Sequence, residues 1–372
     1  MSALTGEHVG ALLREKRIIV CCGAGGVGKT TTAAALSLAA ARAGRRVLVL
    51  TINPSRRLAE TLGVSQNPPA PVALPADRAT AAGIAAPGAL DAWLLNPKVV
   101  ADDAVRRLIP DPAEAQRLID NRIYQQVSTM VAGMHEYTAM EALHRLMETG
   151  RYDLVVLDTP PSRNALDFLE APGRLARLLD MKVFKAFLPK AGGLLTRAAS
   201  KIIEKILSAT FGADFAGEFT AFLTAFSGLF GMLNLDVSRM RAILGGAESA
   251  FLLVCSPAPA AVDEVLFFRD KTRALELPFR GFVLNRTRAG SGRLLPEEAM
   301  LEEKSPEALR GLQKLQALAR DEQSAAERDE TLLAALSSKA GPGAAAIAVP
   351  DLAAGADDMA TLLAIADLLS SR

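Results

Sequence analysis

Short apolar runs alternate with longer stretches of helical periodicity along most of this chain. Six of the apolar runs have the length of a buried strand, and they span residues 17–22, 46–51, 153–157, 250–255, 281–284 and 344–349. Strands that alternate with helices predict an α/β fold with a mostly parallel, doubly wound sheet. In such a sheet the loops at the carboxyl ends of the strands carry the ligand site, so we expect the chemistry at those loops.

The helical patterns are less evenly distributed than the strands. They cover residues 31–43, 91–93, 99–119, 124–147 and a long strandless block at 174–244. Residues 63–88 are rich in proline and alanine, lack a clear period and predict a long surface connection. We therefore expect one domain over residues 1–372, in which helical segments at 91–150 and 174–245 form an inserted helical subdomain.

A glycine-rich motif follows the first apolar run. It consists of Gly23, Ala24, Gly25, Gly26, Val27, Gly28, Lys29 and Thr30 and matches the pattern G-x-x-x-x-G-K-[ST]. A strand before the motif and a helix after it are the context it needs, because backbone N–H groups at the helix N-terminus converge on the phosphates. In this pattern Lys29 reaches the β- and γ-phosphates and the Thr30 hydroxyl binds Mg²⁺. The motif therefore predicts a nucleoside triphosphate site.

The apolar run at residues 153–157 ends in an acidic residue. Asp158 is followed by Thr159, Pro160 and Pro161. In nucleotide hydrolases with a phosphate loop, an aspartate at such a strand end holds Mg²⁺ directly or through water. An aspartate here can instead cap a turn, but the phosphate loop favours the metal role. The stiff segment after it is a candidate switch that senses the γ-phosphate.

A second candidate contact follows the apolar run at residues 281–284. Asn285 and Arg286 stand there, and Thr287 and Arg288 come next. A GTPase would show N-K-x-D at this place, with the aspartate reading the guanine edge, and this chain has no such aspartate. Adenine is therefore the favoured base, with Asn285 and Arg286 as candidate cofactor-binding residues. The alternative for Asn285 is an ordinary turn residue.

Composition narrows the class of protein. Half of the 372 residues are hydrophobic and the formal net charge is +1, which excludes a disordered chain and disfavours a nucleic-acid partner. The three cysteines lie in apolar runs without a C-x-x-C pair, which indicates a reducing compartment. We find neither a signal-peptide pattern nor an uncharged run of about 20 residues. We therefore expect a soluble, cytoplasmic protein.

Together these motifs resemble a known family. The loop from Gly23 to Thr31, the segment 51–55, the segment 158–161 and Asn285 are similar to the arsenical-pump ATPases and the ATPases that target tail-anchored proteins. That family belongs with the Min and Par ATPases, and the resemblance covers nearly the whole chain. It implies ATP and Mg²⁺ as cofactors, and a dimer or pseudodimer that closes on ATP and reopens after hydrolysis.

The chain departs from the family pattern at two positions. Ala24 stands where the family usually carries a second lysine that reaches the partner's phosphates. Asn53 stands where the family has an aspartate that positions or activates the attacking water. An amide cannot accept a proton from water as a carboxylate does, and general acid–base catalysis typically contributes about 10² to 10⁴ in rate. With Lys29, Asn53 and Asp158 as the candidate catalytic residues, we expect slow hydrolysis and retained binding.

Phenylalanines recur along the second helical block. Six of the 14 lie at residues 211, 215, 219, 222, 226 and 230, which places them on one helical face. In targeting members of the resembled family, helical subdomains form an apolar groove for a client's membrane helix. Three interpretations remain: a core or dimer-interface face, a groove for a hydrophobic client, and direct membrane contact.

Two further features bear on partners. Arg197, Lys201 and Lys205 are spaced four apart, which is typical of a solvated face or of a contact with an anionic lipid surface or acidic receptor. Cys21 and Cys22 alternate along one strand and Cys255 ends another, so clustered thiolates for a metalloid are not expected. This disfavours an arsenite-pump role.

The resulting prediction is a nucleotide-switched dimeric ATPase that carries or targets a hydrophobic or membrane-protein client. The alternatives are a low-turnover regulatory subunit paired with a homologous, lysine-bearing ATPase, favoured by Ala24 and Asn53, and a spatial organiser like the Min and Par proteins. The long block at residues 174–244 disfavours the organiser, because those relatives are small and lack such an insertion.

Overall fold

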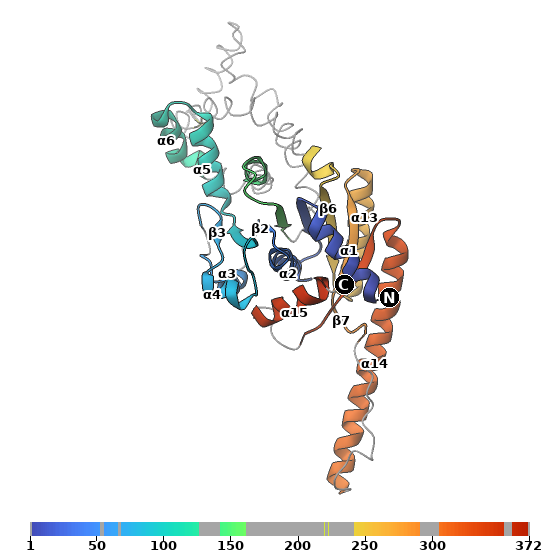
Figure 1. Ribbon diagram of the computed structural model, residues 1–372. Helices are drawn as coiled ribbons and strands as arrows, with labels where there is room; N and C mark the ends of the chain where they lie inside the picture. The colour runs from blue at the N-terminus through green and yellow to red at the C-terminus, as the bar shows by residue number, and fades with distance from the viewer. Residues whose placement is uncertain are drawn as a thin grey trace, which may run out of the picture.

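The computed structural model describes residues 2–52, 56–65, 68–125, 142–160, 219, 222, 242–290, 305–352 and 359–370. An eight-stranded sheet forms the centre of this part of the molecule (Figure 1). Its strands are β1 (Ile18–Cys22), β2 (Arg46–Thr51), β3 (Val72–Ala73), β4 (Ala89–Leu94), β5 (Leu154–Asp158), β6 (Ser249–Cys255), β7 (Phe279–Thr287) and β8 (Ala345–Pro350). The order is β3-β4-β2-β5-β1-β6-β7-β8, and every neighbouring pair is parallel except β3 and β4.

Helices cover both faces of this sheet. They are α1 (Ser2–Glu15), α2 (Lys29–Arg42), α3 (Arg56–Leu62), α4 (Ala76–Ala81), α5 (Pro97–Leu108), α6 (Pro112–Asp120), α13 (Pro259–Ala274), α14 (Pro306–Ala340) and α15 (Met359–Ser370). The connection β1–α2–β2 runs along the sheet in one direction and β6–α13–β7 in the other. Because such crossovers are right-handed, α2 and α13 lie on opposite faces. The predicted doubly wound α/β fold is therefore confirmed.

The core is made by strands that are buried on both faces. β1, β5 and β6 are buried along their whole length. α2 is rich in alanine and packs closely on β2 and β5 while contacting α15. All six predicted strands are present, within a few residues of their expected bounds. Strands with apolar residues on every position are typical of a parallel sheet that helices cover on both sides.

Two predicted elements were wrong. Residues 91–93 are not helical but lie in β4, between β2 and β3. Trp93 is only 1% exposed there, and buried Asp91 accepts hydrogen bonds from Arg151 and Tyr152 (both 2.6 Å). The run is too short for its periodicity to separate helix from strand, so pairing with β2 decided it. The inserted helical segment at 91–150 therefore cannot begin before Pro97.

The expected helix over residues 99–119 is in fact two helices. α5 ends at Leu108, and Asp111 caps α6 by accepting a hydrogen bond from the Ala113 N–H (2.9 Å). Pro112 then occupies the first turn, where its missing N–H costs nothing. The connection predicted at residues 63–88 also holds the short helix α4 and strand β3.

Most of the predicted helical block at 174–245 lies outside the described residues. Phe219 and Phe222 are the two members of the phenylalanine stripe that are described, and Phe222 is buried at 4% exposure. Arg197, Lys201 and Lys205 also lie outside. The inserted subdomain and the function of its phenylalanines therefore stay predictions.

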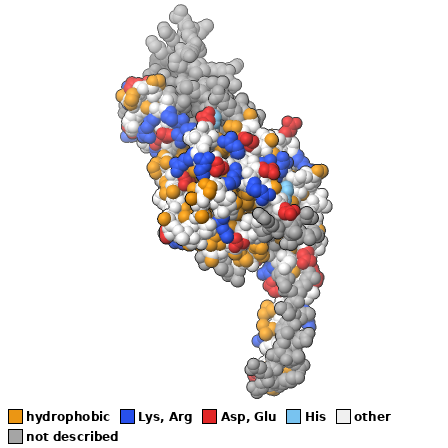
Figure 2. Space-filling view, viewed as in Figure 1, with side chains coloured by type: hydrophobic (Ala, Val, Ile, Leu, Met, Phe, Trp, Pro, Cys, Tyr) orange, Lys and Arg blue, Asp and Glu red, His pale blue; other side chains and the backbone are white. Residues whose placement is uncertain are grey.

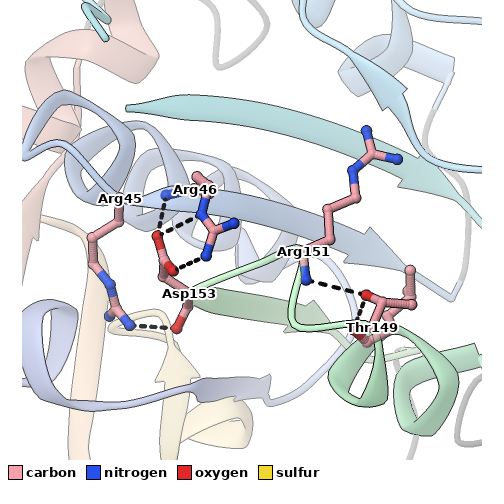
Figure 3. A network of polar contacts seen from close by, with 6 residues as sticks. Arg45, Arg46, Thr149, Arg151 and Asp153 are labelled. Atoms are coloured by element: carbon pink, nitrogen blue, oxygen red, sulfur yellow. Dashed lines mark hydrogen bonds and ion pairs between the residues drawn. The ribbon is translucent and has the colours of Figure 1, made fainter. Parts of the chain in front are cut away.

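A polar network clamps the amino-terminal ends of β2 and β5 (Figure 3). Asp153 accepts from the Arg46 backbone N–H (2.9 Å) and from its guanidinium (2.6 and 3.2 Å), which lowers the pKa of the carboxyl. Arg45 donates to the carbonyl oxygens of Asp153, Leu13 and Lys16. Arg151 lies beside this clamp, with its N–H bound to Thr149 Oγ1 (3.2 Å). The clamp holds the register in which Thr51 pairs with Asp158 at the other end of the two strands.

α14 is the element that departs most from the compact body. It has 35 residues, and its amino-terminal half projects away from the sheet, whereas its last turns pack on β7 and β8 (Figure 1). Figure 2 shows charged side chains of both signs on the body and hydrophobic atoms on the projecting part. Leu315 and Leu318 are 56% and 61% exposed there.

Candidate nucleotide-binding site

The glycine-rich loop joins the end of β1 to the start of α2. Gly26 and Gly28 have φ values of +75° and +91°, which L side chains rarely adopt, and Gly28 is the N-cap of α2. A Cβ on Gly23 would lie 2.0 Å from the Val254 carbonyl oxygen on β6. The neighbouring strand therefore admits only glycine there, and the loop exposes its backbone at the positive end of α2.

Lys29 is folded back over this loop. Its side chain is almost fully buried, and Nζ donates a hydrogen bond to the Ala24 carbonyl oxygen (2.7 Å). Burial lowers the pKa of Lys29, while the nearby Asp158 acts in the opposite direction. A lysine held over the concave side of the loop places its charge where phosphate oxygens would lie. Thr31 follows in the first turn of α2.

Asp158 and Thr30 are in direct contact beside the loop. Thr30 Oγ1 donates to Asp158 Oδ2 (2.6 Å), so the residues predicted as metal ligands are in contact. Asp158 is 2% exposed, and burial raises its pKa to about 7, against the opposing effects of the Thr30 hydrogen bond and Lys29. Asp158 Oδ1 is buried without a hydrogen-bond partner among the described residues. An unpaired buried carboxylate oxygen is costly and needs a cation or a donor.

Thr51 also lies at this site, and the sequence analysis gave it no role of its own beyond the resemblance of the segment 51–55. It is the last residue of β2, pairs in register with Asp158 and is 1% exposed. Its Oγ1 has no hydrogen-bond partner among the described residues. Two buried oxygens that no described residue hydrogen-bonds thus lie on neighbouring strands at the carboxyl edge of the sheet. A hydroxyl at the end of an apolar strand was the available sequence signal.

Asn285 lies on the far side of the loop from Asp158, at the end of β7. Its Nδ2 donates to the Val27 carbonyl oxygen (2.9 Å), and a Cβ on Gly28 would lie 2.0 Å from that nitrogen. Because a carbonyl only accepts, this bond settles the amide orientation and leaves Oδ1 as the free acceptor of the side chain. Asn285 therefore braces the phosphate loop, a contact that neither sequence interpretation anticipated. Arg286 beside it is exposed, with φ +57°.

The structure thus brings the loop, Asp158 and Asn285 together from β1, β5 and β7. Thr159, the first residue of the candidate switch, is tied to β1, where its Oγ1 donates to the Cys21 carbonyl oxygen (2.9 Å). Ala24 is buried at the loop. Asn53 lies outside the described residues, two positions beyond Thr51.

Three buried thiols lie on β1 and β6, the strands that border the loop. Cys21, Cys22 and Cys255 are free and buried, and burial raises the pKa of each. Metals and metalloids bind the thiolate, and its formation is disfavoured here.

Sequence comparison agrees with this geometry. The sequence profile described as anion-transporting ATPase matches residues 16–211, which is more than half of the chain and includes β1, the loop, α2 and β5. The chain belongs to the anion-transporting ATPase family. The suspected family is thereby confirmed.

Several relatives within and around this family are similar to the chain. An uncharacterized protein of Streptomyces coelicolor is 29% identical over 283 residues, which cover 76% of this chain and 63% of the relative. The arsenical pump-driving ATPase of Escherichia coli is 24% identical over 42% of this chain and 26% of its own length. The ATPase get3 of Aspergillus terreus is 25% identical over 44% of this chain and 45% of its own length. The aligned parts span less than two thirds of each relative.

Among the described helices, none is long and apolar enough to cross a bilayer.

Proposed function

We propose that this anion-transporting ATPase family member binds ATP with Mg²⁺ at the loop of residues 23–30 and hydrolyses it slowly. The observation that carries the proposal is the contact between Thr30 and Asp158. It lies beside a carboxylate oxygen that is buried without a partner in the described part of the chain, and close to a buried lysine. Mg²⁺ prefers oxygen ligands, and a hydroxyl with a carboxylate is the set it takes beside phosphates.

Each group of the chain has a distinct part in this proposal. Thr30 Oγ1 and Asp158 would hold Mg²⁺, which would neutralise charge on the phosphate oxygens. The backbone N–H groups at the start of α2 would bind the β-phosphate, and Lys29 would exchange the Ala24 carbonyl for phosphate oxygens. Asn285 Oδ1 would accept from the adenine amino group, whereas guanine offers an oxygen at that place.

Lys29→Ala tests the binding site. By titration calorimetry, we expect wild type to bind Mg-ATP and Lys29→Ala to lose at least about tenfold in affinity, because a charge-assisted contact to the phosphates disappears. Lys16→Ala is the matched control, since Lys16 lies at the opposite edge of the sheet, bound to the Ala247 carbonyl oxygen. Equal affinity of wild type and Lys29→Ala would sink the proposal.

Asn53 is the reason we propose slow turnover. Asn53→Asp should raise the rate of phosphate release from Mg-ATP by about tenfold or more, because a carboxylate can accept a proton from the attacking water. Asn53→Ala should not raise it. Turnover that is the same in all three proteins would show that position 53 plays no part in hydrolysis.

We further propose a nucleotide-dependent dimer, with itself or with a homologous ATPase, that acts on a hydrophobic or membrane-protein client in the cytoplasm. The resemblance to targeting ATPases and the name of the get3 relative support this. Ala24 favours a partner subunit that supplies the missing lysine. Light scattering with Mg-ATP and with ADP tests it: a mass that stays monomeric with both, alone and mixed with a lysine-bearing homologue, would contradict the dimer.

A further inference from the structure

The chain turns sharply just after Asn285. Arg286 has φ +57°, a left-handed conformation that is uncommon for a residue other than glycine and costs on the order of the energy of one weak hydrogen bond. The pairing of β7 with β8 shifts register between Asn285 and Thr287. A backbone held in this conformation needs contacts that outweigh its cost, and those contacts come from α14 and from the end of β8.

Asp329 of α14 makes two of these contacts with one oxygen. Its Oδ2 accepts from Thr287 Oγ1 (3.0 Å) and from the Arg288 backbone N–H (2.7 Å), and the residue is 8% exposed. The Thr287 hydroxyl also accepts from the Ala289 N–H (3.0 Å). Hydrogen bonds to an ionised acceptor are stronger than those between neutral groups. This carboxylate therefore fixes both residues that follow Arg286.

Two more contacts hold the same segment. Arg288 Nε forms an ion pair with Glu322 Oε2 (2.5 Å). Glu322 precedes Asp329 by seven residues, which places both residues on the same face of α14. On the other side, the Thr287 carbonyl oxygen accepts from the Asp351 N–H at the end of β8 (3.0 Å). The segment is thus fixed between α14 and β8.

We infer that Asp329 is a positioning residue for recognition of the base, a role that rests on the proposed ATP site. Asn285 has Nδ2 committed to Val27, so its Oδ1 reads a base only if the end of β7 stays in place. In this inference Asp329 fixes the end of β7 and does not itself contact the nucleotide. Removing Asp329 frees Arg286 to leave its left-handed conformation and shifts Asn285 Oδ1, while Nδ2 keeps its hydrogen bond to the Val27 carbonyl oxygen and so continues to brace the phosphate loop.

The test separates effects on recognition of the base from effects on binding of the phosphates. Titration calorimetry is run with Mg-ATP, Mg-GTP and Mg-tripolyphosphate on wild type, Asp329→Ala and Asp329→Asn. Asp321→Asn on an exposed position of the same helix is the matched control. We expect Asp329→Ala to weaken ATP about tenfold and to leave GTP and tripolyphosphate unchanged, so that the preference for ATP falls about tenfold.

The isosteric variant keeps the inference falsifiable if the alanine variant folds poorly. Asp329→Asn retains a neutral acceptor, so we expect an intermediate loss of about threefold in ATP affinity with tripolyphosphate unchanged. Thr287→Ser, which keeps the hydroxyl, should bind as wild type does, and Thr287→Val should resemble Asp329→Asn.

Three results would overturn the inference. One is an unchanged preference for ATP over GTP in both Asp329 variants. Another is an equal loss for ATP and tripolyphosphate, which indicates general damage to the fold. The third is a wild type that binds none of the three ligands, which refutes both the proposed function and this inference. A wild type that prefers ATP supports the proposed function, whatever the variants do.

Discussion

Replacing Asp158 by asparagine should stabilise the ligand-free protein at high pH. The carboxyl is 2% exposed, and one of its oxygens has no hydrogen-bond partner among the described residues. Burial raises its pKa from 3.8 to about 7. Because its pKa is higher in the folded than in the unfolded state, Asp158 stabilises the fold relative to an ionised carboxyl. This contribution is fully present below about pH 3.8 and is lost as the pH rises to about 7. Asparagine has the same shape and does not titrate.

The magnitude follows from the two pKa values. The full range from 3.8 to about 7 corresponds to about 4 kcal/mol at 1.36 kcal/mol per pKa unit. Between pH 5 and pH 8 wild type should lose about 2 to 3 kcal/mol of its free energy of unfolding through this carboxyl. Asparagine keeps an acceptor for Thr30 but places an amide N–H₂ where Oδ1 was, which costs about 1 to 3 kcal/mol without an acceptor. The pH dependence is therefore a sharper measure than stability at one pH.

Trp93 gives a direct assay. It is the only tryptophan of the chain and is 1% exposed in β4, so its fluorescence reports loss of the core. Urea unfolding of wild type, Asp158→Asn and the exposed control Asp321→Asn is followed at pH 5, 6, 7 and 8. The free energy of unfolding of Asp158→Asn, relative to that of wild type, should increase by about 2 to 3 kcal/mol as the pH rises from 5 to 8. The control should follow wild type.

One result would refute the reasoning. If Asp158→Asn differs from wild type by the same free energy at every pH, the carboxyl does not titrate in this range and burial does not dominate its environment. A second arm adds Mg-ATP at pH 8, where wild type should gain stability by binding and the variant should gain less.

Three further results are expected from substitutions around the loop. Gly28→Ala should cost at least about 2 kcal/mol and remove ATP binding, because the new Cβ combines a left-handed φ with a contact at 2.0 Å from Asn285 Nδ2. Gly26→Ala has the strain without a neighbour within 4 Å and should cost only about 1 to 2 kcal/mol, as measured by the same urea unfolding. Thr51→Val should raise ligand-free stability by about 1 kcal/mol, since it removes a buried hydroxyl to which no described residue is hydrogen-bonded, and a loss of stability would show that this hydroxyl is satisfied.

Local signals in the sequence were enough for six of the eight strands and for the glycine-rich loop. The glycine-rich loop depends on neighbours in the chain, because a strand, a turn and a helix N-terminus must follow one another to bind phosphate. The six apolar runs also depended only on composition and length. The same local reasoning failed at residues 91–93, where a run of this length suits a helix or a strand and pairing with β2 decided between them.

What only the tertiary structure decided is which distant residues meet. Asp158 contacts Thr30, Asn285 braces Val27 and Asp329 holds Thr287, and the partners in these pairs are separated by 128, 258 and 42 residues. The first two contacts follow from the strand order, which sets the carboxyl ends of β2, β5, β1, β6 and β7 side by side, and the third follows from the packing of α14 on β7. Nothing in the sequence near Asp329 marks it, because a single acidic residue on the helix face that also buries Ala326 and Leu336 has no signal of its own. The loop motif is encoded in adjacent residues, whereas the contacts that Asp158, Asn285 and Asp329 make exist only once the sheet has formed.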